Sequence, residues 1–130
     1  MSTKPERPFS ASARLASFRF AFKGIVEFFR SQHNARIHLL CALGAVALGL
    51  WLEIAALQWC VVAFCIAAVF AAELVNTAIE YLTDLVSPGY NEKAGKVKDL
   101  AAAAVLVVSI AALICAAFIF LPPLLVKFGL

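Results

Sequence analysis

The sequence is poor in charge. Asp, Glu, Lys and Arg make up only 15% of the 130 residues, whereas 64% are hydrophobic and the mean hydropathy is +0.94. Soluble domains carry about 25% charged and about 45–50% apolar residues. A chain this short could not hide the excess hydrocarbon, because small domains bury only about 60–70% of their unfolded surface. This composition excludes a soluble domain, a disordered chain and a secreted disulfide scaffold, and it indicates an integral membrane protein.

Lys and Arg are missing altogether between Ile37 and Tyr90. The basic residues gather in the first 36 residues and again at Lys93, Lys96 and Lys98. A nucleic-acid partner would need a continuous basic face, so none is expected. The four cysteines form no C-x-x-C pair and lie inside apolar runs, which is typical of small hydrophobic side chains rather than of disulfides.

The apolar pattern predicts an all-α integral membrane protein with an amphipathic interfacial amino-terminal helix and three transmembrane helices, forming one domain over 14–130. The turn Ser87-Pro88-Gly89 ends the second span, and Pro122-Pro123 end the third. The expected bounds are 1–13 for a disordered tail, about 14–33 for the amphipathic helix, and about 35–52, 54–86 and 97–121 for the spans.

Three spans place the amino terminus and the loop at 87–98 on one side of the membrane. All basic residues except Lys127 fall on that side. Because Lys and Arg favour the cytoplasm, this side is predicted to be cytoplasmic.

A polar stripe runs along the second span. Its members follow the spacing i, i+3, i+4, i+7 and i+11 and lie within about 60° of one line on a helix; they are Glu73, Asn76, Thr77, Glu80 and Asp84. Ionisable groups at membrane depth cost about 2.5–3.5 kcal/mol each and usually face a bundle interior or cavity. The stripe would suit a magnesium site, acid–base chemistry or proton-coupled transport, and a solvated helix end is the simplest alternative.

The adjacent loop, Gly89 to Asp99, brings Lys96 and Lys98 to a helix start, where anions bind. Carboxylates and cations on the cytoplasmic side together indicate phosphoryl transfer. The loop is not a P-loop, because the glycine spacing is wrong and Val97 replaces Ser or Thr. His33 and His38 are about 140° apart on a helix, so we interpret them as interfacial residues and not as a metal pair.

The run Glu73-Leu-Val-Asn-Thr-Ala-Ile-Glu-x-x-x-Asp84, followed by Lys98-Asp99, resembles the signature of the bacterial diacylglycerol kinase and undecaprenol kinase family. Phe22-Lys23-Gly24 and Asn34-Ala-Arg-Ile-His38 resemble that family's amino-terminal region. The resemblance covers about 14–121 and implies a homotrimer in the bacterial inner membrane with active sites shared between subunits on the cytoplasmic side. It implies transfer of the γ-phosphate of Mg²⁺-bound ATP to a lipid alcohol, either diacylglycerol or undecaprenol.

The resemblance also implies roles for particular residues. Glu73 looks like the catalytic base and Glu80 like a metal ligand, and Asn76 looks like an active-site residue. Lys98 would bind phosphates, with Asp99 positioning it. Gly89, Tyr90 and Asn91 match the nucleotide loop, Lys23 matches a basic residue of the first helix, and Gln32 stands where the family usually has a second metal-binding Glu.

Two other functions stay open on the residues alone. A small proton-coupled transporter could use the carboxylates Glu73 and Glu80. A non-enzymatic membrane assembly protein would leave the phased stripe unexplained.

Overall fold

The computed structural model describes residues 11–129, which are helical apart from short connections. The helices are α1 (Ala11–Ser31), α2 (His33–Trp51), α3 (Ala56–Val86) and α4 (Glu92–Phe128). The chain divides into two units, 1–31 and 32–130, and each is described by itself. The predicted all-helical architecture is confirmed over the described residues, with three helices long and apolar enough to cross a membrane.

The first unit contains α1, whose exposed side chains include Phe18, Phe20 and Phe22 beside Arg19 and Lys23. The prediction of a disordered tail over 1–13 was wrong for residues 11–13, which begin this helix. The rest of that tail lies outside the described residues. The interfacial position of the helix stays a prediction.

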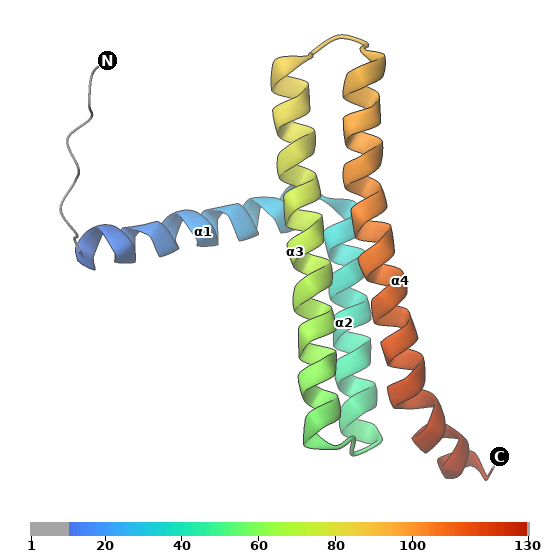
Figure 1. Ribbon diagram of the computed structural model, residues 1–130. Helices are drawn as coiled ribbons and strands as arrows, with labels where there is room; N and C mark the ends of the chain where they lie inside the picture. The colour runs from blue at the N-terminus through green and yellow to red at the C-terminus, as the bar shows by residue number, and fades with distance from the viewer. Residues whose placement is uncertain (1–10, 130) are drawn as a thin grey trace. The chain divides into compact units, whose positions relative to one another are not determined.

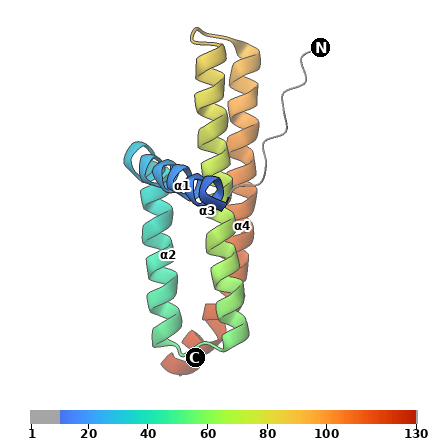
Figure 2. The same ribbon diagram turned by 90° about the vertical axis from the view of Figure 1, so that its left-hand side faces the viewer.

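The second unit is a bundle of α2, α3 and α4. The helices α3 and α4 lie side by side, and both extend beyond the start of α2 (Figures 1 and 2). At 1.5 Å per residue, α2 is about 28 Å long and α3 about 46 Å. Since a hydrocarbon core is about 30 Å thick, α2 matches its thickness and α3 exceeds it.

The unbroken length of α3 follows from its sequence. No Gly or Pro interrupts it before Ser87, so the helix passes through the polar stripe and ends at the predicted turn. At its start, the Gln58 side chain accepts a hydrogen bond from the Ala55 N–H at 2.8 Å. This bond satisfies one of the amides that a helix start leaves unpaired.

The end of α4 differs from the prediction. Pro122 and Pro123 lie inside the helix, which continues to Phe128, so the expectation that they end it was wrong. Their missing N–H groups deprive the carbonyls of Phe118 and Ile119 of helical donors. Membrane helices tolerate such losses because neighbouring groups can satisfy the backbone, and the visible result is the bend at this end of α4 (Figure 1).

The tightest packing lies near the turn between α2 and α3. Ile54, Val62, Ile119 and Phe120 form the buried cluster, and Trp59 packs against it. Gly49 is buried where the Trp59 ring approaches, so that an added Cβ would lie 2.9 Å from ring carbon Cη2. Large apolar side chains on the outside, such as Phe64 and Phe118, are exposed and suit contact with lipid.

Candidate active site

Glu73 is the most deeply buried charged side chain in the described part of the chain, at 3% exposure. Its Oε1 lies 3.1 Å from Nε2 of His38, which belongs to α2, 35 residues earlier. The sequence predicted Glu73 as a site residue but gave His38 no role beyond the interface. The pair joins α2 to α3 at the level where the polar stripe begins.

The next turn of α3 holds a second polar pair. Asn76 donates from Nδ2 to Oε1 of Glu80 at 3.0 Å. The other amide atom, Oδ1 of Asn76, is buried and has no hydrogen-bond partner among the described residues, and the same is true of Oγ1 of Thr77. Two buried oxygen atoms are therefore available to a ligand, a water molecule or another subunit.

The oxygen atoms of this second pair fit a hard cation. Mg²⁺ usually binds one or two carboxylates and completes its shell with water and substrate phosphates. Glu80 supplies a half-buried carboxylate, and the unpaired Oδ1 of Asn76 supplies a neutral oxygen. No group of three His, Cys, Asp or Glu side chains suited to a metal ion occurs in the described part. The donors present thus match a cation held largely by its substrate.

Lys98, on the first turns of α4, pairs with Asp84 near the end of α3. The predicted partner, Asp99, is adjacent in sequence and is exposed. Successive helix positions point about 100° apart, so a side chain is seldom positioned by its direct neighbour. The observed pair links the two helices on either side of the loop.

The loop that joins these helices is fixed by Asn91. Its Oδ1 accepts hydrogen bonds from the backbone N–H of Lys93 at 2.9 Å and of Ala94 at 3.2 Å, which caps α4. Gly89 is exposed, and Tyr90 is 99% exposed. Asn91 thus has a structural task in this chain, while Tyr90 is free to meet a ligand.

Burial falls steadily along the stripe. Exposure is 3% for Glu73 and 7% for Asn76, intermediate for Glu80, and 63% for the Asp84 side chain. Measured from Ala56, Glu73 lies about 26 Å along α3 and Asp84 about 42 Å. If the start of α3 marks one face of a hydrocarbon core about 30 Å thick, Glu73 lies just inside the other face and Asp84 lies outside it. The stripe therefore crosses a membrane boundary, and the alternative of a solvated helix end holds only for its last part.

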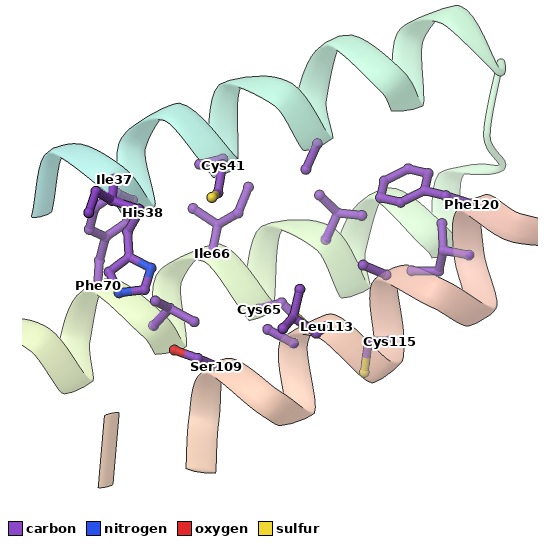
Figure 3. A pocket seen from close by; sticks show the side chains of 17 residues that line it. Ile37, His38, Cys41, Cys65, Ile66, Phe70, Ser109, Leu113, Cys115 and Phe120 are labelled. Atoms are coloured by element: carbon purple, nitrogen blue, oxygen red, sulfur yellow. The ribbon is translucent and has the colours of Figure 1, made fainter. Parts of the chain in front are cut away.

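An apolar cavity of about 260 Å³ opens between α2, α3 and α4. His38 and Ser109 lie at one end of it and Phe120 at the other (Figure 3). Oγ of Ser109 is buried without a partner among the described residues. Cys41, Cys65 and Cys115, one from each helix, line the apolar part as free thiols, in keeping with their predicted role as hydrophobic side chains.

Two predicted site residues lie apart from these pairs. Gln32 precedes α2 as its N-cap, and its side chain does not cap the helix or bond to Glu80. Lys23 belongs to α1, where its Nζ lies 6.0 Å from the centre of the Phe20 ring. Because α1 is described by itself, the predicted role of Lys23 at the site stays a prediction.

The two cross-helix partners had a signal in the sequence. In an antiparallel pair joined by a short turn, residues equally far from the turn lie at the same depth. His38 and Glu73 flank the α2–α3 turn at similar distances, and Asp84 and Lys98 flank the α3–α4 loop in the same way. Helical periodicity within single segments could not find these pairs.

Comparison with known proteins places this small helical membrane protein in a defined class. The profile of the family described as prokaryotic diacylglycerol kinase matches residues 19–120. The chain therefore belongs to the prokaryotic diacylglycerol kinase family, a family of lipid kinases.

Individual relatives agree with this assignment. A diacylglycerol kinase of Synechocystis sp. is 40% identical over 112 residues, which are 85% of this chain and 64% of that protein. An undecaprenol kinase of Bacillus subtilis is 35% identical over 83% of this chain and 88% of its own length. A diacylglycerol kinase of Escherichia coli is 30% identical over 73% and 78% respectively. The chain thus spans somewhat less than two thirds of the Synechocystis relative.

Proposed function

We propose that this protein is an ATP-dependent lipid kinase that transfers the γ-phosphate of Mg²⁺-bound ATP to the hydroxyl group of a membrane lipid alcohol. The observation that carries the proposal is the position of the buried Glu73 carboxylate. It lies at the membrane boundary inferred above, between an apolar cavity on one side and the polar groups of the α3–α4 hairpin on the other. A base at this level can meet a lipid hydroxyl from the membrane and a nucleotide from water.

In the proposed reaction, Glu73 accepts the proton of the lipid hydroxyl. The lipid oxygen forms a bond to the γ-phosphorus, and the bond from that phosphorus to the oxygen bridging it to the β-phosphate breaks. ADP leaves with the bonding electron pair, and Glu73 releases its proton to water. Proton removal by a positioned side chain typically contributes 10²–10⁴-fold to a rate.

The remaining residues bind and orient. Glu80 and Oδ1 of Asn76 would hold Mg²⁺, which when bound neutralises charge on the β- and γ-phosphates. Lys98 reaches the phosphates from the start of α4, with Asp84 holding it between the helices. Gly89 and Tyr90 lie on the exposed loop where the nucleotide would bind, and Asn91 holds the loop end that begins α4.

The membrane setting completes the proposal. The basic residues of the first 36 positions and of the α3–α4 loop place the site on the cytoplasmic side of the bacterial inner membrane. The buried oxygen atoms without partners, Asn76 Oδ1 and Thr77 Oγ1, leave room for groups from a second subunit in a homotrimer. Family membership favours this function over a proton-coupled transporter or an assembly protein.

The test is a transfer assay with the purified full-length protein, Mg²⁺ and γ-labelled ATP, run side by side with diacylglycerol and with undecaprenol. We expect label in at least one extracted lipid, and no label above background with Glu73→Gln. The matched control is Glu53→Gln, which removes a carboxylate at the opposite end of α3 and should leave transfer unchanged. If wild-type protein labels neither lipid, the proposed function is wrong.

A further inference from the structure

We infer that His38 is a positioning residue for Glu73: its imidazole holds the carboxylate oriented and ionised for proton removal. The inference rests on the proposed function for its catalytic consequence. It rests on the structure for the pairing itself, in which Nε2 of His38 lies 3.1 Å from Oε1 of Glu73.

The burial of Glu73 makes a partner necessary. A carboxylate that is 3% exposed loses most of its hydration, and a buried charge without a hydrogen bond is strongly destabilising. Among the side chains described here, His38 is the one that bonds to Glu73, because the Asn76 amide is turned toward Glu80. A hydrogen bond to the charged form of a carboxylate favours that form, which is the one able to accept a proton.

The hydrogen-bond chemistry also sets the orientation. An ionised carboxylate only accepts hydrogen bonds, so Nε2 of His38 carries the hydrogen in this pair. The bond occupies Oε1 and leaves Oε2 available for the lipid hydroxyl. Without the imidazole, the Glu73 side chain would be free to change rotamer at the cavity end, and the geometry required for proton transfer would be lost.

His38 comes from a different helix, and this makes its role specific. It lies on α2 and lines the apolar cavity, whereas Glu73 lies on α3. The lipid side of the site therefore contacts the residue that fixes the base. His33, five positions earlier, is exposed and lies about 140° away around α2, so it offers a matched control.

The test compares three variants in the transfer assay: His38→Ala, His38→Gln and His33→Ala. Gln carries an N–H donor near the place of Nε2 but is not a base. We expect His38→Ala to lower kcat about 10- to 100-fold, as for loss of a hydrogen bond to a charged group, with little change in the KM for ATP. We expect His38→Gln to recover kcat to within about threefold of wild type, and His33→Ala to match wild type.

Two results would overturn the inference. If His38→Ala keeps wild-type kcat, His38 does not position the base. If His38→Gln is as inactive as a folded His38→Ala protein, the imidazole acts through its own basicity and not as a donor. Thermal unfolding in detergent identifies a variant that fails to fold, and in that case His38→Leu replaces His38→Ala as the variant without a donor.

A second readout does not need turnover. The infrared difference spectrum between wild type and Glu73→Gln identifies the Glu73 carboxylate band. We expect this band in wild type and His38→Gln, and its replacement by a protonated carboxyl band in His38→Ala. An unchanged band in His38→Ala would overturn the inference even if lipid transfer is observed. Conversely, wild type that transfers no phosphate would overturn the proposed function while the spectrum still tests the pairing.

Discussion

The two ends of the α2–α3–α4 bundle hold charge in different ways. At the site end, around Glu73 and Lys98, charged and polar side chains meet one another across helices and leave polar atoms without partners. At the turn end, Lys127 donates to the Trp51 carbonyl at 3.2 Å and lies 4.5 Å from the centre of the Trp51 ring. There, the cation is satisfied by backbone and aromatic groups, and Phe128 packs beside the same ring.

The difference separates chemistry from anchoring. Interactions of a cation with an aromatic face at an exposed site contribute about 0.5–1 kcal/mol and need no second charge. Buried carboxylates need specific donors, and charge pairs between helices respond to ligands. We therefore expect substitutions at the site end to change catalysis and substitutions at the turn end to change stability.

The largest effect should come from Glu80→Gln, apart from the Glu73 test above. Loss of this carboxylate removes the proposed Mg²⁺ ligand while Gln keeps an acceptor for the Asn76 amide. We expect transfer to fall about 100-fold or more at limiting Mg²⁺, with partial recovery at high Mg²⁺. A Mg²⁺ titration of the initial rate measures this, with Glu53→Gln as the control at the turn end. An unchanged Mg²⁺ dependence would remove Glu80 from the metal site.

Lys98→Met should have the next largest effect. It removes the cation proposed to bind the phosphates, so we expect kcat/KM for ATP to fall about 10- to 100-fold. Asp84→Asn should lower it less, because Asp84 acts only by holding Lys98. Thermal stability should hardly change in either variant, since exposed ion pairs contribute about 0–1 kcal/mol. Equal losses in both variants would assign Asp84 a direct part in binding.

Gly49→Ala should reduce stability at the turn end. The added Cβ would lie 2.9 Å from the Trp59 ring, and overpacking of this kind typically costs about 1–3 kcal/mol. Thermal unfolding in detergent measures the change, and activity per folded molecule should stay constant. Gly44→Ala is the matched control, because nothing lies within 4 Å of its added Cβ. A Gly49→Ala protein as stable as wild type would show that the Trp59 ring can move aside.

Lys127→Met should have the smallest effect. It removes the cation over the Trp51 ring and its bond to the carbonyl, so we expect a loss of about 0.5–1 kcal/mol in stability. Lipid transfer should equal that of wild type. Comparison of unfolding midpoints and initial rates for this variant and Lys98→Met tests the contrast between the ends directly. A loss of transfer in Lys127→Met would contradict the separation of anchoring from chemistry.

The sequence predicted the helices well because their signal is local. Long apolar runs, the turn at Ser87-Pro88-Gly89 and the phased stripe all lie within single segments. The partners of the site residues are not local, so periodicity placed Glu73 on a face but did not find His38. The prolines misled for a related reason: propensity predicts a helix end, whereas the membrane setting lets α4 continue through Pro122 and Pro123.

Both tryptophans of the chain, Trp51 and Trp59, lie at the turn end. Their fluorescence therefore reports on the closure of α2 and α4 around the turn and is remote from the α3–α4 loop. Emission should follow thermal opening of the turn end and the Gly49→Ala and Lys127→Met changes closely, while nucleotide binding near Tyr90 leaves it nearly constant. The molecule thus carries a built-in optical reporter of its anchor, and its active site is optically silent.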